Sequence, residues 1–211
     1  MDAGRRVSQG SVISPLLSNI YLDPLDHLMA SAEFQMIRYA DDFVVLCRSR
    51  QEADAALEVI RTWVTEAGLT LHPDKTHIAD ATQKADGFDF LGYHFERGYR
   101  WPRKKSLQKL RDNIRSKTGR TNGRTLNAII ASINPTLRGW FGYFKHSIHT
   151  TFTDIDGWVR MRLRSILRKR QKKRGCGRGS DHQRWPNAYF ANEGLYTLKA
   201  ALEVVRQPSR R

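Results

Sequence analysis

Two adjacent acids, Asp41 and Asp42, stand between two short apolar runs and offer the clearest chemistry in the sequence. The flanking residues 36–39 and 43–46 are rich in β-forming side chains, so the stretch predicts a hairpin with the acids at or near its tip. A tight turn favours one Asp, but turn chemistry does not require two. Carboxylates about 4 Å apart repel by about 4 kcal/mol at an effective dielectric constant near 20, and a divalent cation between them removes that cost. Because ligand sets made only of oxygen favour Mg²⁺, the pair indicates a magnesium site.

The alternative is an ordinary surface turn, in which Asp-Asp pairs are common and solvated. The context favours a metal site, because Tyr39 precedes the acids, the hairpin is hydrophobic and the second half of the chain is strongly basic. The motif Tyr39-Ala40-Asp41-Asp42 resembles the active-site hairpin of reverse transcriptases, and its surroundings resemble the group II intron reverse transcriptase/maturase family. This resemblance implies that Asp41 is the principal metal ligand, that Asp42 is its partner and that Tyr39 shapes the nucleotide site. It also implies two Mg²⁺ ions in the complete active site.

A capped helix is expected before the hairpin. Ser14 suits the N-cap and Pro15 the first helical position, whereas Pro24 should kink or restart the helix. The segment that leads into this helix resembles a palm block of the same family. That likeness implies that Gln9 and Gly10 lie beside the primer-template and the incoming nucleotide.

After the hairpin, Ser49 and Glu52 form a capping box for a helix that ends at Gly68. A turn follows, and then a short strand is expected near residues 77–78. Lys75 in that turn would by default be a solvated lysine. Similarity to the next palm block of the family makes it a candidate partner of the nucleotide phosphates.

Residues 88–102 read as another hairpin, whose aromatic side chains could equally face a core. Within it, Leu91 and Gly92 resemble the family segment that braces the primer end, and the glycine permits close backbone approach. The helices and antiparallel strands of residues 1–102 predict an α+β arrangement, which the resemblance identifies as a partial reverse-transcriptase palm.

Charge divides the chain. Residues 1–100 carry 10 Lys/Arg against 15 Asp/Glu, whereas residues 101–211 carry 26 against 6. A basic region of this size predicts a polyanionic partner, with nucleic acid first and an anionic membrane surface second. No apolar run reaches the 18 or so residues needed to span a bilayer, and the two distant cysteines make neither a disulfide framework nor a zinc site. We expect a cytoplasmic chain.

The basic region, residues 103–211, resembles the all-α thumb, or maturase-specific domain, of the same family. Helices are expected over residues 104–117, 125–134, 154–170 and 195–205. Pro135 should end the second of these helices. The rings of Trp140, Phe141 and Phe144 are assigned to the core, and the neighbouring cations to RNA. The predicted RNA-binding residues are Arg138, Lys145, Arg160, Arg164, Arg168, Lys169, Arg170, Lys172, Lys173 and Arg174.

The resemblance covers nearly the whole chain and implies an intron protein that binds structured intron RNA and assists its splicing and mobility. In the family, polymerisation by two metals uses a further aspartate on an earlier palm strand, expected upstream of Gln9, together with the fingers. We therefore expect DNA synthesis on an RNA template from a DNA primer only when an N-terminal fingers/palm polypeptide complements the chain. The alternative is an RNA-binding maturase or splicing cofactor without catalysis of its own, which is the favoured hypothesis for the chain alone.

Overall fold

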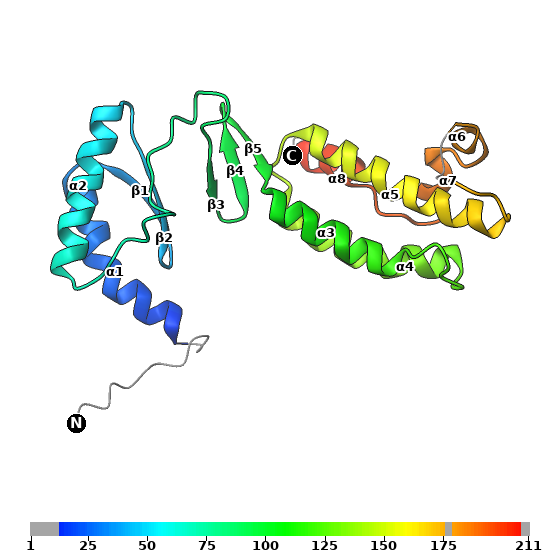
Figure 1. The fold of residues 1–211 in the computed structure, drawn as a ribbon, viewed down its shortest axis with the longest axis horizontal. Coiled ribbons are helices and arrows are strands. Elements are labelled where there is room, and N and C mark those ends of the chain that lie inside the picture. Colours follow the sequence, from blue (N-terminus) through cyan, green and yellow to red (C-terminus); the bar gives the residue numbers. More distant parts are fainter. Residues whose placement is uncertain (1–12, 176–178, 208–211) are drawn as a thin grey trace. The chain divides into compact units, whose positions relative to one another are not determined.

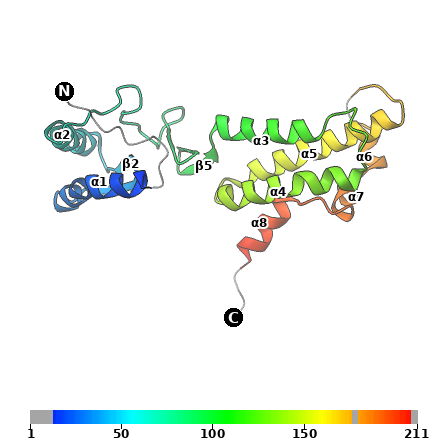
Figure 2. The ribbon, with the colours of Figure 1, turned by 90° about the horizontal axis from the view of Figure 1, so that it is seen from below.

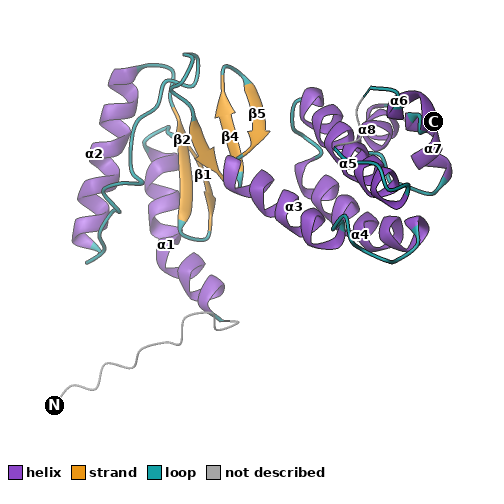
Figure 3. Ribbon diagram, turned by 45° about the vertical axis from the view of Figure 1, so that its right-hand side comes forward, coloured by secondary structure: helices purple, strands orange, loops and turns teal. Residues whose placement is uncertain are grey.

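The computed structural model describes residues 13–175 and 179–207, and the chain forms two compact units, residues 1–91 and 92–211. The first unit packs two helices against one face of a hairpin (Figure 1; Figure 3). Its elements are α1 (Ser14–Ser31), β1 (Gln35–Tyr39), β2 (Asp42–Leu46), α2 (Arg50–Glu66) and β3 (Phe88–Phe90). α1 contacts β1 and α2, and α2 contacts β2. The buried core between these elements consists of Leu25, Met29, Ala56, Ile60 and Val64.

Of the expectations for α1, the N-cap at Ser14 and the restart at Pro24 are wrong. The helix continues through Pro24 without a restart, and Ile13 takes the N-cap position with no side-chain hydrogen bond, so Ser14 is the first helical residue. A proline removes one backbone hydrogen bond from a helix interior. Leu25 and Met29, which follow the proline, are nevertheless fully buried, and their packing stabilises the helix beyond it.

The capping box at the start of α2 is confirmed in its main part. Ser49 Oγ accepts a hydrogen bond from the Glu52 amide at 3.1 Å. The Glu52 carboxylate reaches back to the amide of Arg48, one residue before the cap, at 2.6 Å. In the part of the chain that the structure describes, no strand lies between α2 and β3, so the strand expected near residues 77–78 is wrong.

The second unit is mainly helical. It contains the antiparallel pair β4 (Tyr93–Glu96) and β5 (Tyr99–Pro102), then α3 (Lys104–Lys117), α4 (Leu126–Phe144), α5 (His149–Arg170), α6 (Asp181–Arg184), α7 (Asn187–Asn192) and α8 (Leu198–Arg206). α3, α4 and α5 run alongside one another (Figure 2), and one core joins them to α7 and α8. The helix predicted over residues 104–117 has those bounds, and the compositional boundary at residue 103 lies between β5 and α3.

Pro135 does not end a helix as expected. α4 runs from Leu126 to Phe144 with this proline inside it. Ile133 and Leu137 on either side are fully or almost fully buried, and Phe141 and Phe144 continue the same packed face. Burial of this stripe outweighs the lost hydrogen bond. The assignment of the rings to the core is confirmed for both phenylalanines.

Asp156 joins α5 to α8. It is 4% exposed, and its carboxylate accepts hydrogen bonds from the amides of Leu198 and Lys199, both at 3.0 Å. These two amides lie in the first turn of α8, where backbone N–H groups lack partners inside the helix. Burial raises the pKa of Asp156 above its ordinary value, although the two hydrogen bonds act in the opposite direction.

We predict that Asp156→Ala lowers the free energy of unfolding by about 2 kcal/mol, because two buried donors lose their acceptor. Because the pKa of Asp156 is raised, the folded state binds its proton more tightly than the unfolded chain does. The stability that this proton contributes is fully present below the ordinary pKa of about 3.9 and is lost as pH rises through the raised pKa. Asp156→Asn should remove this fall from denaturation curves recorded over pH. Asp154→Asn, an exposed neighbour on the same helix, is the control and should leave the profile unchanged.

None of the helices within residues 13–175 and 179–207 combines the length and the apolar character needed to cross a membrane.

Candidate functional site

The acidic pair lies where the hairpin reverses. Tyr39 pairs with Asp42 across the two strands, which leaves Ala40 and Asp41 as a two-residue turn. Asp41 is therefore in the turn, and Asp42 is the first residue of β2. Ala40 has a φ of +54°, a left-handed conformation that is uncommon for a residue with a side chain.

The two faces of the hairpin have different surroundings. Residues directly opposite each other on paired strands share a face. The pair Met36 and Val45 packs on the helical core, as does Phe43. Tyr39 and Asp42, the pair next to Arg38 and Phe43, therefore project to the other face, away from α1 and α2.

That second face is open in the described part of the chain. Tyr39 is 67% exposed, Ile37 on the same face is 46% exposed, and Asp42 is exposed. Asp41 in the turn is exposed as well. The hairpin thus presents the Tyr39 ring and the Asp42 carboxylate on the side of the sheet that its own helices do not cover, and Asp41 is exposed at the adjoining turn.

The carboxylates suit a hard divalent cation. Among the described residues, no side chain donates a hydrogen bond to Asp41 or Asp42 and no cation pairs with them, so their oxygens are open to a ligand. Mg²⁺ is commonly bound by one or two carboxylates with waters and substrate phosphates completing its shell. Among residues 13–175 and 179–207, no three His, Cys, Asp or Glu side chains form a metal cluster, so the hairpin would supply two protein ligands to a cation.

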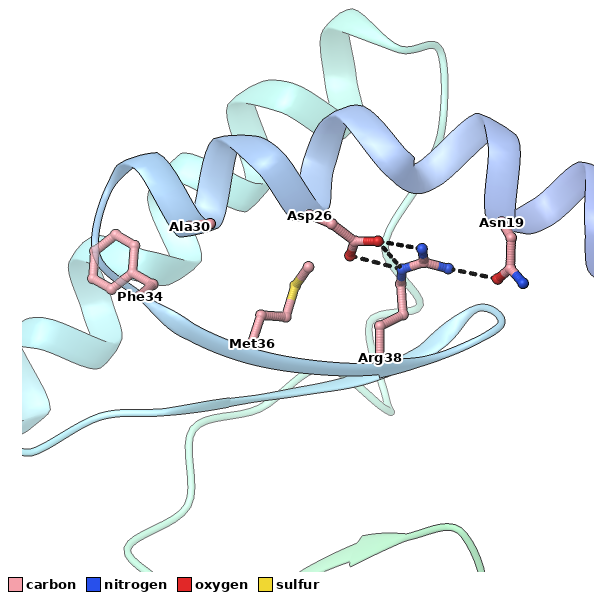
Figure 4. A pocket seen from close by; sticks show the side chains of 6 residues that line it. All are labelled: Asn19, Asp26, Ala30, Phe34, Met36 and Arg38. Atoms are coloured by element: carbon pink, nitrogen blue, oxygen red, sulfur yellow. Dashed lines mark hydrogen bonds and ion pairs between the residues drawn. The ribbon is translucent and has the colours of Figure 1, made fainter.

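An arginine supports this turn from the helical side, and the sequence analysis did not identify it. Arg38, next to Tyr39 on β1, donates from Nε to Asp26 Oδ1 at 2.8 Å (Figure 4). It also donates from Nη1 to the Ala40 carbonyl oxygen at 2.9 Å. Nη1 also donates to Asn19 Oδ1 at 3.0 Å. These residues line a cavity of about 440 Å³ between α1 and β1. The available sequence signal was a charged residue on the inward-facing register of a hydrophobic strand.

The other residues predicted to contact the nucleotide or the primer are separated from this turn in the sequence. Lys75 is an exposed residue of the turn that follows α2, where its amide bonds the His72 carbonyl oxygen. Leu91 has a φ of +46°, a left-handed conformation. Gly92 has a φ of +78° and begins the second unit, where its carbonyl oxygen accepts the amide of Arg103 at 2.9 Å. Gln9 and Gly10 lie outside the described residues.

The basic run at the end of α5 folds into a defined surface in the second unit. Residues 171–175 turn back after the helix, and Arg168 accounts for part of this turn by donating to the Arg174 carbonyl oxygen at 2.7 Å. Arg120, from the turn after α3, donates to the Gly175 carbonyl oxygen at 2.9 Å. These contacts give the backbone of residues 174 and 175 partners on α5 and on the turn after α3.

These contacts create what we call the cationic cavity, a space of about 360 Å³. None of the residues that line it is acidic, and five of them are cations. The five cations are Arg120, Lys169, Lys172, Lys173 and Arg174. All five are exposed. Several positive charges around one hollow favour binding of phosphate groups, with an affinity that falls as salt rises.

Two predicted RNA-binding residues have internal partners instead. Arg164 is 2% exposed and donates to the Trp185 carbonyl oxygen at 2.9 Å and to Asn187 at 2.8 Å, and burial lowers its pKa. Arg168 pairs with the buried Asp181 at 2.7 Å. Arg164 thus ties α5 to the start of α7, and its burial does not fit the RNA-binding role predicted for it.

The other predicted RNA-binding cations divide by exposure. Arg138 is exposed, with its guanidinium 5.1 Å from the centre of the Tyr196 ring, whereas Lys145 and Arg160 are half-buried. Arg170 is exposed and donates to the Arg124 carbonyl oxygen, which joins the end of α5 to the turn before α4.

Comparisons with known proteins match two separate parts of the chain to two families. Residues 3–95 match the family described as reverse transcriptase (RNA-dependent DNA polymerase), and residues 107–185 match the group II intron maturase-specific domain. Over 81 residues, the chain is 33% identical to the retrovirus-related Pol polyprotein from type-1 retrotransposable element R2 of Nasonia vitripennis. That alignment covers 35% of this chain and 8% of the length of that relative.

Proposed function

The chain belongs to the group II intron reverse transcriptase/maturase family, and on that premise we propose that its hairpin acids bind the divalent cations of an RNA-directed DNA polymerase while its basic helical unit binds intron RNA. The family and the α+β class are as predicted. The single observation that carries the polymerase proposal is the placement of Asp41 and Asp42 at the hairpin turn with Tyr39 on the uncovered face.

The hairpin residues divide the work of a metal-dependent site. Asp41 and Asp42 would hold Mg²⁺ through carboxylate oxygens, and bound Mg²⁺ supplies charge stabilisation for the attacking hydroxyl and the leaving pyrophosphate. Tyr39 lies beside Asp42 on the open face and limits the space in which a nucleotide can lie. Lys75, an exposed cation after α2, is proposed as a contact for the nucleotide phosphates.

RNA binding is proposed for the cationic cavity together with Arg138, Lys145, Arg160 and Arg170. Support comes from the exposed cations of the cavity and from the match of residues 107–185 to the maturase-specific domain. Contacts of this kind go to the phosphate backbone, so they give affinity and orientation more than base sequence preference. Arg164 and Arg168 are not included, because their guanidinium groups hold the helices of the unit together.

The polymerase proposal is tested by primer extension on an RNA template with Mg²⁺. The chain is assayed alone and mixed with an upstream palm polypeptide of the same family, which supplies the additional aspartate that the resemblance implies. We predict product in the mixture, loss of at least about 100-fold with Asp41→Asn because a metal ligand loses its charge, and full activity with Glu58→Gln, an exposed acid on α2. Two results would contradict the polymerase role. One is product that persists with Asp41→Asn, and the other is no product from the mixture that contains the unsubstituted chain.

A further inference from the structure

The guanidinium of Arg38 connects α1 to the turn that carries Asp41. Figure 4 shows its contacts with Asp26 and Asn19 on α1. The Arg38 side chain is 11% exposed and bonds both carboxylate oxygens of Asp26, the side-chain oxygen of Asn19 and the carbonyl oxygen of Ala40. Two of these acceptor residues, Asn19 and Asp26, lie on α1 seven residues apart, and the third is Ala40 in the turn. The arginine is thus a bridge between a helix of the core and the apex of the hairpin.

We propose that Arg38 is a positioning residue that holds the peptide plane between Ala40 and Asp41 in one orientation, so that the Asp41 carboxylate is presented to the cation in a single arrangement. This inference deepens the proposed metal-binding function and rests on it for its consequence. Its structural part, the ordering of the turn, can be tested without any metal.

The rigidity of the peptide group makes the bond to Ala40 effective. The Ala40 carbonyl and the Asp41 amide belong to the same planar unit, so fixing the carbonyl oxygen also fixes the direction in which the Asp41 backbone leaves the turn. The donor is charged, and a charge-assisted hydrogen bond is about twice as strong as one between neutral groups.

The turn has a reason to need this support. Ala40 at φ +54° occupies a conformation that costs a non-glycine residue about 1 kcal/mol or more, and such residues persist when their surroundings over-determine them. Glycine at this position would adopt the turn without support. In this chain the hydrogen bond from Arg38, on β1 of the same hairpin, supplies the restraint, and Asp26 on α1 holds that arginine.

Asp26 orients the guanidinium for this role. Hydrogen bonding to Arg38 lowers the pKa of Asp26, and the same bonds raise the pKa of Arg38, so both groups stay charged near neutral pH. With Nε and Nη2 directed at Asp26, the planar guanidinium leaves Nη1 directed at Ala40 and Asn19. An ion pair that served only to join α1 to β1 would not require the contact with the turn.

The decisive variant is the charge swap Asp26→Arg with Arg38→Asp. It restores an ion pair between α1 and β1, but an aspartate at position 38 cannot donate to the Ala40 carbonyl. We expect NMR spectra recorded without metal to show native methyl signals for Leu25 and Met29, which report the core, together with broadened or shifted amide signals for Ala40 and Asp41. We expect the dissociation constant for Mn²⁺, measured by paramagnetic broadening, to rise about tenfold.

Asn19→Ala is the matched control, because it removes one partner of Nη1 and leaves the bond to Ala40 intact. It should preserve the turn signals and change the Mn²⁺ affinity less than twofold. Arg38→Lys provides a second variant that keeps the charge and should loosen the turn, since one ammonium cannot reproduce the fork of contacts. Native turn signals and unchanged Mn²⁺ affinity in the folded charge swap would overturn the positioning role while leaving metal binding intact. Broadened or shifted turn signals in the charge swap would support the role of Arg38 in ordering the turn, whether or not the wild-type protein binds Mn²⁺. Failure of the wild-type protein to bind Mn²⁺ would refute only the proposed metal site.

Discussion

Replacing Lys169, Lys172, Lys173 and Arg174 by alanine should weaken binding of the chain to structured intron RNA by about 100-fold at about 0.1 M salt. These four side chains line the cationic cavity and are exposed, so their loss removes phosphate contacts without removing an internal partner of the fold. The slope of log affinity against log salt should become shallower by about 4, because each lysine or arginine that contacts a phosphate contributes about one unit. Filter binding or fluorescence anisotropy over a salt series measures both quantities.

A variant of equal charge separates position from net charge. Lys104, Lys105, Lys109 and Arg206 are also exposed cations of the second unit, and none of them lines the cavity. Alanine at these four positions should cost less than about tenfold in affinity and change the salt slope by about 1 or less. If both quadruple variants lost the same affinity with the same change of slope, binding would depend on net charge alone and the cavity would not be the RNA site.

The second large effect concerns the hairpin acids. The double substitution Asp41→Asn with Asp42→Asn should raise the dissociation constant for Mn²⁺ by at least about 100-fold, because two negatively charged ligands become neutral amides. Removing the repulsion between the two carboxylates should at the same time leave the metal-free hairpin as stable as before or slightly more stable. Electron paramagnetic resonance of free Mn²⁺ gives the affinity, and chemical denaturation gives the stability.

Asp54→Asn with Glu58→Gln is the corresponding control on the exposed side of α2, where both acids are paired with arginines of the same helix. It removes the same charge from the first unit and should leave the Mn²⁺ affinity within about twofold. Equal losses in the two double variants would mean that the cation is attracted by the unit as a whole and has no site at the turn.

Local sequence was sufficient for much of the fold. Adjacent acids between β-forming runs predicted the hairpin and its tip, and the capping box of Ser49 and Glu52 predicted α2. The bounds of α3 followed from composition alone. These features depend on residues within a few positions of one another, where turn chemistry and helix propensity operate.

The expectations that proved wrong involve local preferences that packing overrides. Pro24 and Pro135 each disfavour a helix by a few kcal/mol, yet both lie within helices whose neighbouring turns are buried. Arg164 has the charge of a surface residue but lies among α5, α6 and α7 because the Trp185 carbonyl oxygen and Asn187 accept its hydrogen bonds. Neither outcome is visible in a window of neighbouring residues.

The sequence by itself determined the family resemblance, the acidic turn, the basic character of the second half and most helices, because each is written in residues close together along the chain. Only the tertiary structure decided that Arg38 bonds both the turn at Ala40 and Asp26, 12 residues earlier in the chain. The same is true of the hydrogen bond from Arg120 to a carbonyl oxygen 55 residues later. The tertiary structure also decided which cations remain exposed. The physical reason is that a hydrogen bond or an ion pair depends on distances in space, which chain folding sets, and the spacing of residues along a sequence does not specify them.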